Sequence, residues 1–176
     1  AVPASRMEAQ PQGTSKRPVV FVHGLGGHPG NFSALELKLR FAGMGQLYRV
    51  DLRDNASMVS AAASLASSIK SILEMNGLDE DGQVDLVAHS MGGVLSRVAL
   101  LNPKLKTRVR RLITLGTPHH GSHLAWYLTR YVGAGAELSP ECSIWDDLST
   151  QEPWDSTTEL TSFYTATDCL VRPASS

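Results

Sequence analysis

The sequence has little that would mark a membrane protein or a nucleic-acid-binding protein. None of its apolar runs comes near the roughly 18 residues that suggest a membrane-spanning helix. Acidic and basic residues nearly cancel, 17 against 16, for a formal net charge of -1, and no run of like charges suggests a nucleic-acid partner. The composition, 42% hydrophobic and 19% charged over 176 residues, is that of a single soluble globular domain.

Cysteine is scarce, which limits how far disulfides can hold the fold together. The two cysteines, Cys142 and Cys169, either form one disulfide in an oxidising compartment or stay reduced as small buried apolar residues. Residues 1–18 contain no signal peptide, but they are rich in Pro, Ser, Gln and Gly and predict a flexible leader of the kind left after a signal is removed. We therefore expect a secreted or extracytoplasmic protein, with a cytoplasmic location as the alternative.

Residues 19–176 alternate between short apolar runs and amphipathic segments, which predicts one α/β domain. The apolar runs are typical of buried parallel strands. The expected strands are 19–22, 48–52, 84–88, 109–115 and 159–167. Helices are expected between them, since parallel strands need crossover connections. The expected fold is therefore a doubly wound, mostly parallel sheet with helices on both faces.

Helical spacing of apolar residues locates these helices. They are expected from Asn31 or Ser33 to Gly43 and at 57–73, 91–101 and 122–131. On the second helix, the apolar face should consist of residues at intervals of three and four. These are Val59, Ala62, Ala66, Ile69 and Leu73. Residues 133–158 show no periodicity, and we interpret them as either a lid over the site or an irregular excursion.

The motif Ala88-His89-Ser90-Met91-Gly92-Gly93 lies where a buried strand meets a helix. A nucleophile on such a strained elbow needs small flanking residues, because backbone segments approach closely there. Ala88 and Gly92 meet that need. The following helix also directs its unpaired amides toward developing negative charge. A serine in an ordinary strand-to-helix turn is usually only a cap, but this context predicts that Ser90 is a nucleophile.

A glycine-rich loop, His23-Gly24-Leu25-Gly26-Gly27, directly follows the first strand. Acyl transfer needs two donors for the oxyanion, and a glycine-rich loop can present a backbone N–H without obstruction. Such a loop alone would equally suit phosphate, but no lysine follows in P-loop spacing. We therefore expect the amides of Leu25 and Met91 to form the oxyanion hole.

Together with Gly116-Thr117-Pro118-His119-His120-Gly121 and Thr167-Asp168-Cys169-Leu170-Val171, these motifs resemble those of small bacterial triacylglycerol lipases and esterases of the α/β-hydrolase superfamily. The likeness covers nearly all of 18–171, and Ala88 in place of glycine is similar to the elbow of the minimal bacterial lipases. The resemblance implies that Ser90 is the nucleophile, that Leu25 and Met91 supply the oxyanion amides, and that Asp168 is the triad acid. No cofactor and no metal are expected.

Asp168 also has an argument from position, since a carboxylate after a strand can orient an imidazole at the sheet edge. The alternative is an ordinary turn aspartate. Asp51, Asp146 and Asp147 are lesser candidates. In this superfamily the base histidine follows the acid, yet no histidine follows Asp168. We therefore expect a fragment, a piece of a nicked protein or a truncated product, with a second polypeptide supplying the missing segment.

The six histidines that are present offer weaker candidates for the base. His23 and His89 belong to the loop and the elbow, where local hydrogen bonding is the ordinary role. An unconventional base would be His119, His120 or His123, and the spacing of the last two also suggests a metal site that lacks a convincing third ligand.

Two functions remain open at this point. One is a serine hydrolase acting on acylglycerols or short-chain acyl esters through an acyl-enzyme on Ser90. The other is a catalytically impaired fragment or subunit that binds acyl ligands without turnover. The tryptophans Trp145 and Trp154 suit an apolar lid for lipid, although aromatic residues in loops more often plug a core.

Overall fold

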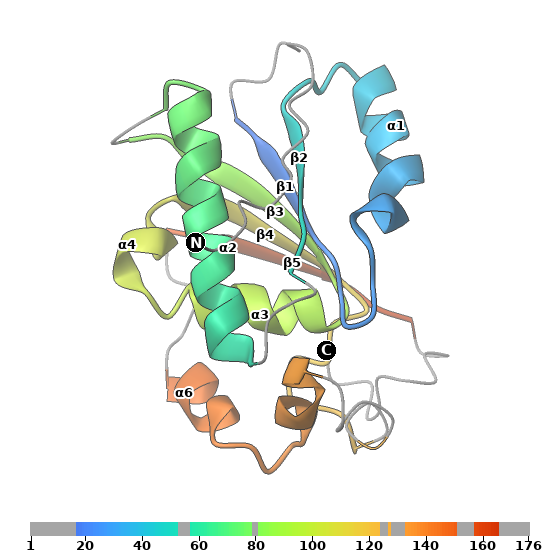
Figure 1. The fold of residues 1–176 in the computed structure, drawn as a ribbon, viewed down its shortest axis with the longest axis vertical. Coiled ribbons are helices and arrows are strands. Elements are labelled where there is room, and N and C mark those ends of the chain that lie inside the picture. Colours follow the sequence, from blue (N-terminus) through green and yellow to red (C-terminus); the bar gives the residue numbers. More distant parts are fainter. Residues whose placement is uncertain are drawn as a thin grey trace.

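The computed structural model describes residues 17–52, 57–78, 81–123, 127, 133–150 and 157–165. Within these residues lies a five-stranded sheet in the order β2-β1-β3-β4-β5, in which all neighbouring strands run parallel (Figure 1). The strands are β1 Val19–Val22, β2 Leu47–Val50, β3 Val84–His89, β4 Val109–Leu115 and β5 Glu159–Phe163. The expected mostly parallel α/β sheet is therefore confirmed.

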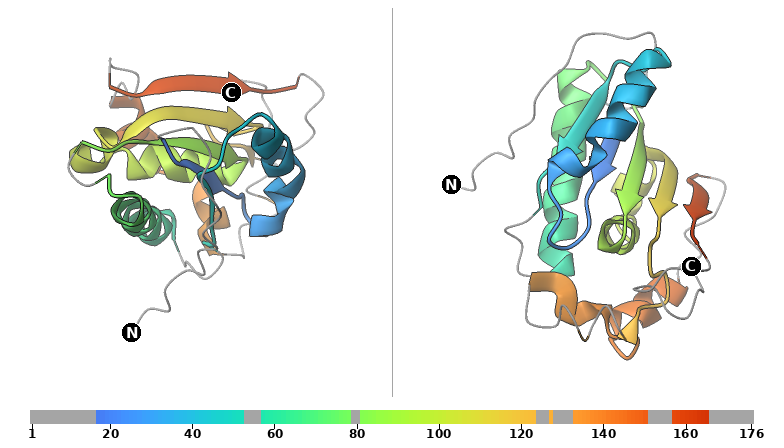
Figure 2. Two further views of the ribbon diagram at one scale, coloured as in Figure 1. Left: turned by 90° about the horizontal axis from the view of Figure 1, so that it is seen from above. Right: turned by 90° about the vertical axis from the view of Figure 1, so that its right-hand side faces the viewer.

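Helices pack against both faces of the sheet, as Figures 1 and 2 show. Their bounds are η1 Pro29–Phe32, α1 Ser33–Phe41, α2 Met58–Met75, α3 Met91–Ala99, α4 Pro103–Lys106, η2 Gly133–Leu138 and α6 Ile144–Thr150. On the α1 face, Phe21 of β1 stacks on Phe32 with ring centroids 5.0 Å apart. The other face carries α2 and α3 and the larger apolar cluster.

Of the five residues expected on the buried face of α2, Ala62, Ile69 and Leu73 are buried and Ala66 is half-buried. Val59 is 66% exposed, whereas Met58, Leu65 and Ile72 are fully buried. Neighbouring helical residues are about 100° apart, so Val59 lies at one edge of the expected stripe, and Met58, Leu65 and Ile72 extend the buried face at the other edge. The helix begins where it does because Ser57 forms a capping box with Ser60.

Several other expected boundaries shift. The second strand lies at Leu47–Val50 rather than 48–52, and β5 stops at Phe163 instead of continuing to residue 167. Within the expected helix 122–131, His123 and Tyr127 are helical. No helix in the described ranges is both long enough and apolar enough to cross a bilayer.

The segment that lacked periodicity contains two short helices, η2 and α6. Ala134 and Leu138 from η2, together with Ile144 and Leu148 from α6, are buried in the same cluster as α2 and α3. Trp145 is half-buried, and its Nε1 donates a hydrogen bond to the Ser139 carbonyl at 2.6 Å. These contacts attach the described part of the segment to the body of the domain.

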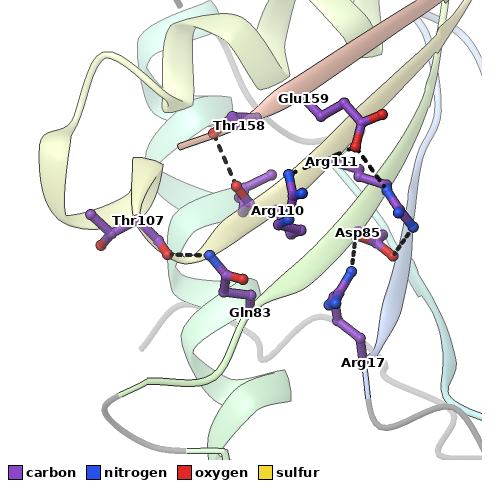
Figure 3. Close-up of polar contacts among 9 residues, drawn as sticks. Arg17, Gln83, Asp85, Thr107, Arg110, Arg111, Thr158 and Glu159 are labelled. Atoms are coloured by element: carbon purple, nitrogen blue, oxygen red, sulfur yellow. Dashed lines mark hydrogen bonds and ion pairs between the residues drawn. The ribbon is translucent and has the colours of Figure 1, made fainter. Parts of the chain in front are cut away.

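A ladder of ion pairs crosses the sheet near the amino ends of its strands (Figure 3). Asp85 of β3 lies 3.4 Å from Arg17 and 3.9 Å from Arg111 of β4, and Arg111 lies 3.2 Å from Glu159 of β5. The strand register places Asp85, Arg111 and Glu159 in one row. This row links three neighbouring strands at the end of the sheet opposite the elbow.

Candidate active site

Ser90 connects β3 to α3 in an unusual backbone conformation. Its φ of 53° and ψ of -129° make it the only described non-glycine residue with positive φ. The Ser90 N–H donates to the Leu115 carbonyl at 2.9 Å, and the Ser90 carbonyl accepts from Thr117 Oγ1 at 3.0 Å. Such strain persists only where surrounding contacts impose it. Here β4 and the loop after it impose it.

Close backbone approaches around the elbow exclude larger residues. A Cβ on Gly92 would lie 2.5 Å from the Val22 carbonyl oxygen, and one on Gly93 would lie 2.1 Å from Thr117 Oγ1. A Cβ on Gly24 would lie 2.9 Å from Ser90 Cβ. The loop after β1 is therefore packed directly against Ser90. Leu25 follows Gly24 and Met91 follows Ser90. Their amides therefore belong to the two chain segments that meet at the serine.

His23 fixes the shape of the loop after β1. The Leu52 N–H donates to His23 Nε2 at 3.2 Å, so the ring proton is on Nδ1, which donates to the Gly24 carbonyl at 2.9 Å. The ring is buried, and Asp51 Oδ1 lies 3.6 Å from Nε2. Both ring nitrogens of His23 are thus engaged in holding β1, β2 and the glycine-rich loop together.

His119 has a similar buried position in the loop after β4. Arg97 of α3 can only donate, so His119 Nδ1, 3.4 Å from the guanidinium, accepts, and Nε2 donates to Thr114 Oγ1 at 3.0 Å. Burial, followed by the positive charges of Arg97 and His120, lowers the pKa of His119 to about 4. His119 is therefore neutral at pH 7, and its ring joins α3 to β4.

Arg97 is an anchor that the sequence analysis missed. Its guanidinium donates to the carbonyls of His119 at 2.7 Å and Leu148 at 3.3 Å, and its burial lowers its pKa. The residue therefore connects α3 with the loop after β4 and with α6. The available signal was a single arginine in an otherwise small and apolar helix. Thr117, which donates to the Ser90 carbonyl, is a second such residue, because its motif alone indicates no role for it.

The other residues considered as a base, an acid or a metal ligand do not come together in a hydrogen-bonded cluster with Ser90 among the described residues. Among the described residues, none forms a hydrogen bond with Ser90 Oγ, and no group of three or more suitable side chains could hold a metal ion. His120 and His123 are exposed, and His123 Nδ1 lies 3.9 Å from Glu141. Asp146 and Asp147 are exposed in the first turn of α6.

Two predicted residues lie outside the described ranges, namely Asp168 and Cys169. Trp154 also lies outside them. Cys142 is half-buried and is not bonded to another cysteine among the described residues. The roles predicted for Asp168 and for a Cys142–Cys169 disulfide therefore stay predictions.

Several solved structures with a similar fold are lipases. The mature form of Bacillus licheniformis lipase BlEst2 is 28% identical, with a TM-score of 0.68 over 85% of this chain and 65% of that one. Its propeptide form is 26% identical, with a TM-score of 0.73 over 89% of this chain and 38% of that one. Aspergillus fumigatus lipase B, 18% identical, shares the fold with a TM-score of 0.72 over 91% of this chain and 40% of that one.

The parallel sheet, the strained serine and these neighbours define an α/β-hydrolase fold of the lipase and esterase kind. A family model described as the PGAP1-like alpha/beta domain matches residues 39–132, and the chain belongs to that family. The chain spans less than two thirds of the length of the lipases named above. The resemblance to the α/β-hydrolase superfamily noted from the sequence motifs is confirmed.

Proposed function

We propose that this chain carries the nucleophile and the oxyanion hole of a serine hydrolase that cleaves carboxylic esters. The observation that carries the proposal is the strained backbone of Ser90 at the start of α3, packed against Gly24. A strained strand-to-helix turn of this kind is typical of a nucleophile elbow, in which the hydroxyl is turned out of the sheet and lies beside a helix amino terminus. An ordinary N-cap serine needs no such strain, because cap residues normally adopt extended backbone angles.

The proposed reaction proceeds through an acyl-enzyme. Ser90 Oγ attacks the ester carbonyl carbon while a histidine accepts the hydroxyl proton, and the amides of Leu25 and Met91 stabilise the oxyanion. Collapse of the tetrahedral intermediate breaks the C–O bond, and the histidine returns its proton to the leaving alcohol. Water, deprotonated by the same histidine, then releases the acid and regenerates Ser90. Asp168 orients the imidazole.

The base is proposed to be a histidine from a polypeptide segment outside these 176 residues. His23 and His119 are unsuited because both nitrogens of each ring already contact neighbouring groups. His120 and His123 are exposed and remain weaker candidates. Support for ester substrates comes from the lipases with which the chain shares its fold, and acylglycerols and short-chain acyl esters are the proposed classes.

A covalent probe tests the assignment of the nucleophile. In a form that carries the base, an alkyl fluorophosphonate should modify Ser90, and peptide mass spectrometry should locate the adduct there. Ser90→Ala should abolish labelling, whereas Ser67→Ala, which changes an exposed serine on α2, should label as the wild type does. Labelling of a different residue at an equal rate would contradict the proposal.

The alternative, a subunit that binds acyl ligands without turnover, draws on one observation. The described residues provide no hydrogen-bond partner for Ser90 Oγ. Without a base, the oxyanion amides and binding leave only about 10³–10⁴-fold acceleration over water. We therefore expect a homogeneous preparation of the 176-residue chain to be nearly inactive toward a chromogenic ester. Robust turnover would point instead to His120 or His123 as an unconventional base.

A further inference from the structure

A cavity of about 530 Å³ opens between the carboxyl-terminal half of α2 and the α4 region. Figures 1 and 2 show these two helices side by side on the same side of the sheet. The volume falls within the roughly 300–1,000 Å³ typical of small-molecule sites. The cavity borders Asn102, which follows the carboxyl end of α3, whereas Ser90 precedes the amino end of that helix. It is therefore separate from the candidate active site.

The floor of this cavity is apolar. Ile69 and Leu73 of α2 and Leu105 of α4 line it, and all three belong to the main core cluster. Ala66 of α2 lines it as well and is half-buried. Because Ile69, Leu73 and Leu105 are already buried, the driving force for an apolar ligand entering here would be mainly the removal of its own surface from water.

The rim is predominantly cationic. Lys70, Lys104 and Arg108 line the cavity together with a single carboxylate, Glu74. Glu74 lies 3.7 Å from Lys70, and the Arg108 guanidinium is positioned by a 3.0 Å hydrogen bond to the Leu78 carbonyl. The residues that line the cavity thus include three cations and one carboxylate. An anionic headgroup is the complement of this rim.

We propose that this cavity is a second binding site, for a single-chain amphiphile with a carboxylate head, such as a long-chain fatty acid. The apolar floor takes the alkyl chain, and the rim cations take the carboxylate. The proposed hydrolase reaction would release a ligand of this class, but binding at this site does not depend on Ser90. The Ser90→Ala variant therefore separates the two proposals.

Equilibrium binding of dodecanoate to the Ser90→Ala chain, measured by titration calorimetry below the micelle concentration, tests the site. Saturable binding of one equivalent is expected, and dodecyltrimethylammonium should bind more weakly because it carries the wrong charge. Hexanoate should also bind more weakly, because it buries less apolar surface. No dodecanoate binding, or equal affinity for the cationic and anionic amphiphiles, would overturn the proposal.

Variants locate the bound ligand. Ala66→Trp fills the cavity and should weaken binding at least 10-fold, whereas Ala63→Trp places the same side chain at an exposed position on α2 and should leave affinity within 2-fold. Because Ala66→Trp also risks overpacking, Lys104→Glu at an exposed position supplies a second test, with a loss of about 2–5-fold expected for one exposed charge. Lys38→Glu on α1 is its control.

Two results would exclude the site. If neither Ala66→Trp nor Lys104→Glu weakens dodecanoate binding, the fatty acid binds elsewhere. A second result is that dodecanoate fails to bind while an acidic amphipathic peptide binds, and that Lys104→Glu abolishes binding of the peptide. In that case the cavity is a protein-docking surface and the fatty-acid assignment is wrong. Neither result bears on whether Ser90 is a nucleophile, which the fluorophosphonate labelling decides separately.

Discussion

At the carboxyl ends of its strands the sheet holds a strained serine among close backbone contacts, whereas at their amino ends it holds a ladder of ion pairs. Ser90 has a φ of 53°, and Gly92 is packed against the Val22 carbonyl. In the ladder, the side chains of Arg111 and Glu159 are 47% and 53% exposed. The contacts at the carboxyl end are short and sterically demanding, whereas at the amino end Asp85 is buried but Arg111 and Glu159 are half exposed to solvent.

This difference separates what the fold needs from what the site needs. Exposed ion pairs contribute little to stability, so the exposed members of the ladder, Arg111 and Glu159, should tolerate substitution. A backbone held at positive φ is unfavourable by about 1–3 kcal/mol and persists only because neighbouring contacts impose it. If the strain serves chemistry, changes at the carboxyl end should affect activity strongly, and changes at the amino end should affect it hardly at all.

The largest effect is expected for Ser90→Ala in a form that carries the general base. We expect kcat/KM for a short-chain ester to fall by at least about 10³-fold, because losing a triad member removes nucleophilic catalysis. The free energy of unfolding should change by less than about 0.5 kcal/mol, since alanine retains the same backbone strain. Retention of more than about a hundredth of the wild-type rate would contradict the assignment.

The buried His119 ring makes stability depend on pH. Its pKa of about 4 in the folded protein lies below the ordinary 6.5, so the unfolded chain binds the proton more tightly. The neutral His119 ring therefore contributes fully to the free energy of unfolding above pH 6.5. As the pH falls toward 4, this contribution decreases by on the order of 2–3 kcal/mol.

Urea unfolding at pH 7.5 and 4.5 measures this loss, and His119→Gln is the matched variant. The wild type should lose more stability between the two pH values than the variant does, because glutamine does not titrate. An equal loss in both proteins would show that His119 is not the group responsible.

The sequence predicted the sheet and the elbow because both depend on local patterns. Buried parallel strands appear as short apolar runs, and β4 was located at its observed bounds, 109–115. The elbow combines a serine, small neighbours and a strand-to-helix transition within six residues, 88–93. Such features can be recognised without knowing what the segment packs against.

What the sequence missed depends on contacts between distant segments. The helices η2 and α6 are 6 and 7 residues long, too short to display a clear apolar period. The role of Arg97 depends on the carbonyls of His119 and Leu148, 22 and 51 residues further along the chain. Of the five residues predicted on the apolar face of α2, only Val59, at its edge, is exposed, because periodicity alone does not fix how far that face extends on either side.

A third prediction concerns steric contacts at the carboxyl end. Gly92→Ala puts a Cβ 2.5 Å from the Val22 carbonyl oxygen, which is backbone and cannot rotate away. We expect a loss of about 1–3 kcal/mol in the free energy of unfolding, with a fall in kcat/KM as the elbow shifts.

Gly43→Ala is the control for this substitution. Gly43 has a φ of 87° and no atom within 4 Å of an added Cβ, so alanine there should cost about 1 kcal/mol through strain alone. Its kcat/KM should stay within 2-fold of the wild type. Equal effects of the two substitutions on kcat/KM would contradict the claim that the close contacts at the carboxyl ends of the strands matter for activity.

The smallest effect is expected at the amino end, where Arg111→Ala removes the centre of the ion-pair ladder. Arg111 lies 3.9 Å from Asp85 and 3.2 Å from Glu159, but its side chain is 47% exposed, so solvent screens the arginine charge even though Asp85 is buried. We expect the free energy of unfolding to fall by only about 0.2–1 kcal/mol, with a smaller difference in high salt and no change in kcat/KM. Urea unfolding at two salt concentrations, paired with the ester assay, measures all three. A loss of several kcal/mol that persists in high salt would show that Asp85 depends on this arginine as a buried ion does, because an uncompensated buried carboxylate is strongly destabilising.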